Sequence, residues 1–417
     1  MYRKVVLDNG LRVVIERMPT LKSVTIGIWV NVGSRDEGSG EEGVSHFIEH
    51  MFFKGTASRS ATEISREIDA LGGEMNAFTG RETTTFYVKV LDQHVKPALA
   101  LLSDLFHHSR LDPKEIEKEK QVVLEEVRMV QDDPEDLVQD IHTELMMKQH
   151  PLGRPILGKT RSIQALRQTD LRRYIDAHYH PHETVVSVAG NFNVRELLRL
   201  LQKFFGSVAG PGRPAVRRWP PAFHGGVSVR RKALEQAHLC LGLKGIRLDD
   251  KDRYGVFALN SLLGGSVSSR LFQEIREKRG LAYSIYSFAS SYSDAGTVTV
   301  YAATRPREAS RVVDLICREI RQLRHRGVER KELERTKKHM KGSLMLSLES
   351  TQSRMSKLAK DELFLGRHMS LEEMMADIDQ VSTEQINRLS REVFNLDSLT
   401  VTAVGPISRR SLHSALH

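Results

Sequence analysis

The stretch GSVAGPGRPAVRRWPPAFHG, residues 206–225, divides the sequence into two halves. It holds four of the 13 prolines and lacks hydrophobic periodicity, which is typical of a linker. On either side of it the sequence predicts the same order of elements: strands, a helix, a pair of strands, several helices and a final strand. We therefore expect two α+β domains of similar fold, related by duplication, at residues 1–208 and 226–417, with a linker at 209–225.

The two halves are predicted to match element by element. In the first half we predict strands around the turn Asp8-Asn9-Gly10 (3–17) and at 23–32, 74–79, 83–91 and 184–190, and helices at 41–53, 61–71, 94–108, 113–131, 134–148 and 193–205. In the second half we predict strands at 226–231, 237–245, 282–290, 296–303 and 398–404, and helices at 251–263, 268–279, 306–324, 328–346, 351–365, 370–378 and 382–393. Each sheet is expected to be mostly antiparallel, with helices packed on it. The long helical return before each final strand favours a mixed sheet.

The composition is that of an ordinary globular protein, with 40% hydrophobic and 28% charged residues. Lys plus Arg is 62 and Asp plus Glu is 53, which gives a net charge of +9. The basic residues are scattered and aromatic content is only 6%, so salt-dependent nucleic-acid binding is the weakest functional hypothesis. The two cysteines, Cys240 and Cys317, are too few for a disulfide framework, and we expect both to be packed in the interior.

The sequence predicts neither a membrane span nor a secretion signal. No stretch approaches the ~18 consecutive apolar residues that a transmembrane helix needs. The opening residues, MYRKVVLDNG, have no apolar signal core and do not have the composition of a transit peptide. We therefore expect a cytoplasmic protein, or a mature form without its leader, that has no membrane partner.

The strongest chemical signal is the run His46-Phe47-Ile48-Glu49-His50. A helix turns about 100° per residue, so both histidines and Glu49 share one face. Two imidazoles one turn apart can bind one zinc ion, and the carboxylate beside them can reach a water on the metal. Glu49 would take a proton from that water as general base and return it to the leaving amine. The alternative is a solvated helix face that carries two histidines by chance.

A catalytic zinc ion needs a third protein ligand, and the helix predicted at 113–131 offers candidates. Glu119 and Glu126 are seven positions apart and share a helix face, whereas Glu125 is turned about 100° away from Glu126. We predict that Glu126 is the ligand and that Glu119 orients a ligand or tunes the site. The alternative is a surface helix covered by Glu–Lys ion pairs.

A second group of histidines, His178, His180 and His182, looks like a metal cluster in the sequence HYHPH. These residues are expected to end a helix and enter a strand across Pro181. We therefore favour a structural role for them over metal binding.

Together these segments resemble the inverted zinc metallopeptidases of the pitrilysin/insulinase family. The closer resemblance is to its short-chain branch, which includes the beta subunit of the mitochondrial processing peptidase and bacterial processing-protease-like peptidases. It covers the whole chain and rests on LDNGLRVVIE, GVSHFIEHMFFKGT, GGEMNAFTGRETTTFY, EKQVVLEE, AGNF and LFQEIREKRGLAYSIYS. It implies a zinc-dependent endopeptidase with one zinc per chain that cleaves extended or unfolded peptides. It also implies that the two domains form half of a clamshell chamber.

The resemblance implies a role for each matched residue. His46, His50 and Glu126 match the zinc ligands, Glu49 the general base and Glu119 the acidic neighbour. Arg276 and Tyr283 match a pair that holds the substrate and stabilises the oxyanion, a role that suits a permanent cation and a neutral donor. Asn76, Ala77 and Phe78 match an edge strand to which a peptide substrate adds as a further strand.

The resemblance also bears on partners. Members of the short-chain branch that have lost the zinc motif or the Arg/Tyr pair work only beside a partner. This chain keeps both, which implies a homodimer in which Arg276 and Tyr283 complete the active site of the second subunit. The alternative function is a non-catalytic scaffold, like the family's core subunits of a respiratory complex, which typically lack the metal residues.

Overall fold

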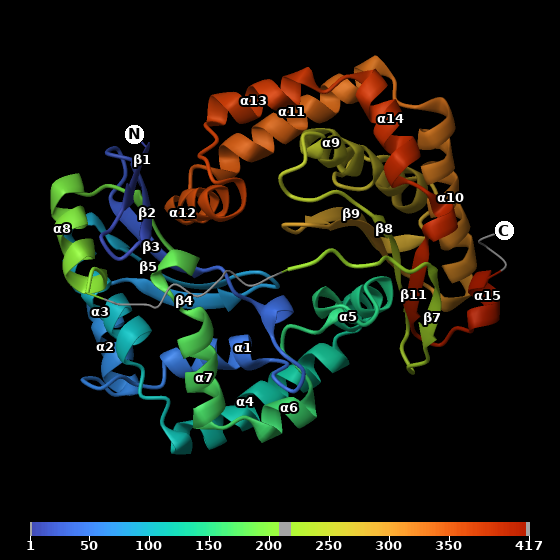
Figure 1. The fold of residues 1–417 in the computed structure, drawn as a ribbon. Coiled ribbons are helices and arrows are strands. Elements are labelled where there is room, and N and C mark those ends of the chain that lie inside the picture. The colour runs from blue at the N-terminus through green and yellow to red at the C-terminus, as the bar shows by residue number, and fades with distance from the viewer. Residues whose placement is uncertain (1, 208–217, 414–417) are drawn as a thin grey trace. The chain divides into compact units, whose positions relative to one another are not determined.

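The computed structural model describes residues 2–207 and 218–413, which form two compact units (Figure 1). Unit 1 consists of residues 2–128, 154–207 and 347–368, and unit 2 of residues 129–153, 218–346 and 369–413. Each unit therefore contains one segment from the other half of the sequence. This exchange was not predicted from the sequence, and much of the predicted linker at 209–225 lies outside the described residues.

Unit 1 contains a six-stranded mixed sheet in the order β1-β2-β6-β3-β5-β4. Its strands are β1 (Tyr2–Val6), β2 (Arg12–Arg17), β3 (Ser23–Val30), β4 (Glu74–Thr79), β5 (Thr84–Leu91) and β6 (Thr184–Gly190). The last strand, β6, runs parallel to β2 and antiparallel to β3, so the expectation of a mixed sheet is confirmed. β4 lies at one edge and pairs only with β5 among the described strands.

Helices cover both faces of this sheet. They are α1 (Val44–Phe52), α2 (Ala61–Ala70), α3 (Val95–His108), α4 (Pro113–Asp132), α6 (Thr160–Ala165), α7 (Gln168–His178), α8 (Val194–Phe205) and α12 (Thr351–Lys360), followed by the π-helical turn η7 (Asp361–Leu365). Short 3₁₀ turns lie at η1 (Ser34–Asp36), η2 (Asp92–His94) and η4 (Pro181–Glu183). Neither α6 nor α7 was given bounds in the sequence analysis.

The strand β3 shows why both faces need a cover. Its residues are buried along almost the whole strand, which is the pattern of a central strand enclosed on two sides. On one face, Phe47 and Phe52 of α1 pack in the main core of the unit. On the other face, Trp29 and Met355 of α12 lie in a separate core cluster. A helix from the second half of the sequence thus completes the first sheet.

Unit 2 repeats the topology with a five-stranded sheet in the order β7-β11-β8-β10-β9. Its strands are β7 (Gly226–Arg230), β8 (Ala237–Lys244), β9 (Ala282–Ser291), β10 (Gly296–Thr304) and β11 (Thr400–Val404). Its helices are α5 (Pro134–Met146), α9 (Arg253–Leu263), α10 (Ala309–Arg326), α11 (Arg330–Ser347), α13 (Leu371–Gln380), α14 (Thr383–Val393) and α15 (Arg409–His413), with 3₁₀ turns η3 (Pro151–Gly153), η6 (Pro306–Glu308) and η8 (Leu396–Ser398). The helix predicted at 268–279 is a π-helical segment, η5 (Phe272–Glu277).

The two sheets correspond strand for strand: the order β2-β6-β3-β5-β4 in unit 1 matches the order β7-β11-β8-β10-β9 in unit 2. In each, the final strand pairs in parallel with a strand near the start of its half and antiparallel with the next. Helix α5, from the first half of the sequence, packs on β8 and β11. The predicted fold class, two similar α+β domains with mostly antiparallel sheets, is confirmed.

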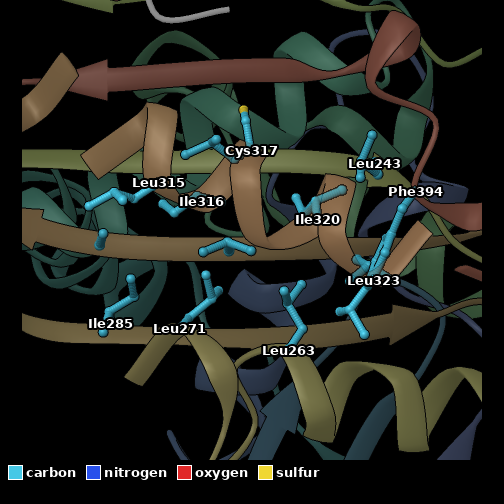
Figure 2. Packing of buried hydrophobic residues seen from close by; sticks show 14 of the residues in the cluster. Leu243, Leu263, Leu271, Ile285, Leu315, Ile316, Cys317, Ile320, Leu323 and Phe394 are labelled. Carbon is cyan, nitrogen blue, oxygen red and sulfur yellow. The ribbon is translucent and has the colours of Figure 1, made fainter. Parts of the chain in front are cut away.

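The core of unit 2 is built largely from α10 and the sheet beneath it (Figure 2). Cys317 lies in this core among aliphatic side chains such as Ile316 and Ile320. Both Cys240 and Cys317 are free and buried, as predicted. Within residues 2–207 and 218–413, no helix combines the length and the apolar character needed to cross a bilayer.

Candidate metal centre

The helix that carries both histidines begins at a constrained point. Gly43, the residue before α1, has a positive φ of 93°, and a Cβ there would lie 2.6 Å from the carbonyl oxygen of Leu157. No acidic residue lies in the first turn of α1. Instead, the buried carboxylate of Glu37 accepts hydrogen bonds from the backbone N–H groups of Gly43 (2.8 Å) and Ser45 (3.0 Å). Burial raises the pKa of Glu37 to about 8, although these hydrogen bonds oppose the shift.

The three residues predicted as metal ligands converge. The Nε2 atoms of His46 and His50 are 3.2 Å apart, and Oε2 of Glu126 on α4 lies 3.6 Å from the first and 3.5 Å from the second. Ligand atoms placed about 2.0–2.2 Å from one ion in a tetrahedron are about 3.3–3.6 Å from one another. Two imidazole nitrogens and one carboxylate oxygen are also a donor set that zinc prefers. The residues therefore fit a zinc ion in both chemistry and spacing.

Glu125 points away from this group, as its position on the helix predicts. Its carboxylate pairs with Arg128 on the exposed side of α4. The sequence argument that chose Glu126 over Glu125 therefore agrees with the geometry of the helix.

Glu119 contacts the Nδ1 side of the His50 ring, opposite the nitrogen that faces Glu126. Its Oε1 accepts a hydrogen bond from Nδ1 of His50 at 2.9 Å, and its Oε2 lies 2.7 Å from the ammonium of Lys54. Burial opposes ionisation of Glu119, but the hydrogen bonds from His50 and Lys54 outweigh it and lower the pKa of the carboxyl. A carboxylate that accepts from Nδ1 leaves the lone pair on Nε2 of His50 available for a metal ion that Glu126 and His46 would share.

The two imidazoles differ electrostatically. Burial, assisted by the nearby charge of His50, lowers the pKa of His46 to about 4, so its ring is neutral near pH 7. Burial alone would also lower the pKa of His50, but the hydrogen bond to Glu119 and the charge of Glu126 raise it. A neutral imidazole is the form that binds a metal.

Glu49 lies on the same face of α1. Burial raises the pKa of its carboxyl, and hydrogen bonding to Thr79 partly offsets the rise. The hydroxyl of Thr79, the last residue of β4, donates to Oε2 of Glu49 at 2.5 Å. A half-buried carboxyl with a raised pKa suits proton transfer near neutral pH.

The predicted substrate residues Asn76, Ala77 and Phe78 lie on β4, at the edge of the first sheet. Ala77 is buried, whereas Asn76 and Phe78 are exposed. The ring of Phe78 makes an edge contact with Trp29 at 5.4 Å between centroids. β4 is therefore an edge strand that leads directly to Thr79 and Glu49.

Arg276 and Tyr283 lie in unit 2 and contact each other. The guanidinium of Arg276 sits 5.2 Å from the ring centroid of Tyr283 and 4.8 Å from that of Phe272. Tyr283 lies on β9, an edge strand of the second sheet, and its side chain is 79% exposed. Such exposure is unusual for a tyrosine and leaves its hydroxyl accessible.

The histidines near residue 180 do not form a metal group. His180 contacts the backbone carbonyl of Ala177 at 3.1 Å, and the ring of His182 fills the space beside Gly10. In the part of the chain that the structure describes, His46, His50 and Glu126 are the one group of three or more with metal-ligand spacing.

Three residues that support this site were not predicted from the sequence: Thr79 and Lys54, which contact Glu49 and Glu119, and Glu37, which holds the start of α1. Lys54 lies just beyond α1, which ends at Phe52, so helical spacing from His50 did not predict its ion pair with Glu119. Thr79 directly follows the predicted substrate residues, so its proximity to the strand was foreseeable but its bond to Glu49 was not. Glu37 gave no signal, because an acidic residue seven positions before Val44 is not a usual helix cap.

Comparisons with known proteins identify the family of the chain. The family described as "Insulinase (Peptidase family M16)" matches residues 12–160, and the "Peptidase M16 inactive domain" matches residues 165–340. The zinc protease YmxG of Bacillus subtilis (strain 168) is 45% identical over 397 residues, which cover 95% of this chain and 97% of that protein.

Two solved structures share the fold. A protease from Helicobacter pylori superimposes with a TM-score of 0.92 at 24% identity, over 97% of this chain and 99% of that chain. A chain of complex III2 from Candida albicans gives a TM-score of 0.86 at 20% identity, over 99% of both chains. These structures show the fold, and the family matches and the 45% identity to the Bacillus subtilis protein show that this chain belongs to peptidase family M16, the insulinase family.

Proposed function

We propose that this chain is a zinc-dependent endopeptidase that cleaves extended or unfolded peptides and binds one zinc ion. The observation that carries the proposal is the convergence of Nε2 of His46, Nε2 of His50 and Oε2 of Glu126, with all three atoms within 4.8 Å of one another. The name of the Bacillus subtilis relative, a zinc protease, supports the same metal and the same class of reaction.

Zinc held by these residues would polarise the scissile carbonyl and make water more acidic. Glu49 would accept the proton of the attacking water and then donate it to the leaving amine. Its raised pKa supports this double role, because the carboxyl must be able both to take and to release a proton near neutral pH. Glu119 would hold His50 in the tautomer and orientation that present Nε2 to the metal.

The substrate would bind by strand addition along β4. Backbone hydrogen bonds to Asn76, Ala77 and Phe78 would hold an extended peptide with little demand on its sequence. Only a segment without stable structure of its own can pair in this way, which favours unfolded peptides over folded proteins.

Arg276 and Tyr283 are proposed to bind the substrate and to stabilise negative charge on the carbonyl oxygen. Their mutual contact and the exposure of Tyr283 support a role in binding. We further propose that the enzyme is a homodimer in which this pair serves the active site of the second subunit.

The scaffold alternative has less support. A scaffold has no need for two histidines and a carboxylate that converge, nor for Glu119 in hydrogen-bond contact with one of them. The assembled site therefore favours an enzyme.

The proposal is tested with a library of quenched fluorescent peptides. Purified protein should cleave some of them, lose this activity on treatment with a chelator, and regain it when zinc is restored. Absence of both bound zinc and cleavage would contradict the proposal and favour the scaffold.

A further inference from the structure

The hydrogen bond between Thr79 and Glu49 joins two parts of the proposed enzyme that are distant in sequence. Oγ1 of Thr79 lies 2.5 Å from Oε2 of Glu49, and both side chains are partly buried. In this bond the threonine hydroxyl donates and the carboxylate oxygen of Glu49 accepts. The bond holds the Glu49 carboxylate against the end of β4 and disfavours rotamers that would turn it toward solvent.

The two elements that carry these residues are tied together by the segment 33–37. Backbone N–H groups of Ser34 and Arg35 donate to the carbonyls of Gly80 (3.1 Å) and Arg81 (2.9 Å), immediately after β4. A buried ion pair of 2.6 Å between Arg35 and Glu82 reinforces this connection.

The same segment also holds the start of α1. The carboxylate of Glu37 accepts the backbone N–H groups of Gly43 and Ser45, as described above. One short segment thus fixes the end of β4 on one side and the start of α1 on the other. The distance between Thr79 and Glu49 is therefore set by buried contacts of the fold.

The position of Thr79 on β4 gives the bond a functional meaning. Among the described residues, no strand pairs with the outer edge of β4, and the proposed substrate residues Asn76 to Phe78 end where Thr79 begins. A peptide added to this edge would lie along the strand that ends at Thr79, so one hydrogen bond would separate the peptide-binding strand from the carboxylate of Glu49. Thr79 does not itself need to touch the reacting atoms.

From this geometry we infer that Thr79 is a positioning residue for Glu49, which links the peptide-binding edge strand to the general base. The inference rests on the proposed function. It predicts that the hydroxyl of Thr79, and not its methyl group or its size, supports turnover.

The test compares Thr79→Val, which keeps the size but removes the donor, with Thr79→Ser, which keeps the donor. Thr85→Val is the matched control, because Thr85 lies on the neighbouring strand and its buried hydroxyl has no hydrogen-bond partner in the described structure. We expect kcat of Thr79→Val to fall by about 10- to 100-fold, with KM and zinc content close to those of the wild type. Thr79→Ser should recover most of the loss, and Thr85→Val should match the wild type.

A crystal structure of Thr79→Val provides a readout that does not depend on activity. The Glu49 carboxylate should move or occupy more than one rotamer. A single unchanged rotamer, wild-type kcat in Thr79→Val, or equal losses in the Val and Ser variants would overturn the inference. Failure of the proposed function is recognised separately, because the wild type itself would then show no zinc-dependent cleavage.

Discussion

Nδ1 of His50 donates to Oε1 of Glu119 across 2.9 Å, and the other oxygen of the same carboxylate pairs with Lys54. The acceptor carboxylate fixes the tautomer of His50, because only a protonated Nδ1 can donate to it. Nε2 is then free to bind a metal beside His46 and Glu126. The proposed ligand set therefore depends on Glu119, which is not itself one of the proposed ligands.

Glu119→Gln tests this dependence. The amide can present its N–H₂ group to Nδ1 and favour the wrong tautomer, so zinc affinity should fall by about 10- to 100-fold. Zinc affinity is measured by competition with a chromophoric chelator. Glu125→Gln is the matched control, since Glu125 is exposed on the same helix and pairs with Arg128. Unchanged affinity in Glu119→Gln would show that His50 does not need this carboxylate.

Arg276→Ala tests the proposed substrate-binding pair. Loss of a cation that stabilises charge in the transition state should lower kcat/KM by about 10²- to 10³-fold, while zinc content stays unchanged. Arg279→Ala is the control, because Arg279 lies three positions away and pairs with Glu274. Equal activities in the two variants would remove Arg276 from the active site.

A mixture of inactive variants tests the homodimer. Subunits with Glu49→Gln and subunits with Arg276→Ala should regain partial activity when purified as mixed dimers, because one of the two sites then receives both intact residues. Mixed dimers that remain inactive would contradict the shared site. A protein that is monomeric at assay concentration would contradict the homodimer itself.

His142 predicts acid sensitivity in unit 2. This side chain of α5 is buried, its Nδ1 is 3.0 Å from Oγ1 of Thr402, and burial lowers its pKa to about 3. The folded state thus favours the neutral ring, so stability is fully present above the unfolded pKa of about 6.5 and is lost as the pH falls toward 3. The wild type should lose about 2 kcal/mol more than His142→Asn between about pH 7 and pH 5.

The measurement is the urea dependence of unfolding at each pH. His325→Asn, an exposed position on α10, is the control and should keep the pH dependence of the wild type. If His142→Asn also keeps it, protonation of His142 does not limit stability in acid.

Met355→Ala tests the exchange of α12 onto the first sheet. Met355 is fully buried, and its sulfur accepts a hydrogen bond from Nε1 of Trp29 at 3.0 Å. The truncation should lower the free energy of unfolding by about 2–5 kcal/mol. Unfolding in urea is measured by the change in tryptophan fluorescence, to which Trp29 contributes. Met345→Ala, at a position that is 51% exposed, should change it by less than about 0.5 kcal/mol. Similar stabilities of the two variants would show that α12 contributes little to the unit.

Hydrophobic periodicity predicted most of the strands and helices, because each sheet and each amphipathic helix buries a regular set of side chains. The helix α6, which has only six residues, was missed, and for α7 only the end near His178 was expected, without a start. The exchange of α5 and α12 was also beyond sequence reasoning. An amphipathic helix shows which face it buries, but its pattern does not say on which sheet that face packs.

The grouping of the proposed metal ligands was predictable because helix geometry brings His46 and His50, together with the proposed base Glu49, to one face of α1. The same geometry places Glu126 rather than Glu125 on the inner side of α4. The contact between Arg276 and Tyr283 was implied only by the family resemblance, since a spacing of seven residues across a turn carries no information on its own. The contacts of Thr79 with Glu49 and of Glu37 with the start of α1 join segments that meet only in the folded chain. Such contacts have no signature in the local sequence.

Glu49→Gln tests the central claim most directly. The amide has nearly the shape of the carboxyl but cannot act as a base, so the variant should bind one zinc per chain and lose nearly all peptide cleavage. Zinc is quantified by metal analysis, and cleavage is followed with the peptides that the wild type cuts. Full zinc with no turnover is the result that the proposed mechanism predicts. Substantial cleavage by the zinc-loaded variant would contradict the role of Glu49 as general base.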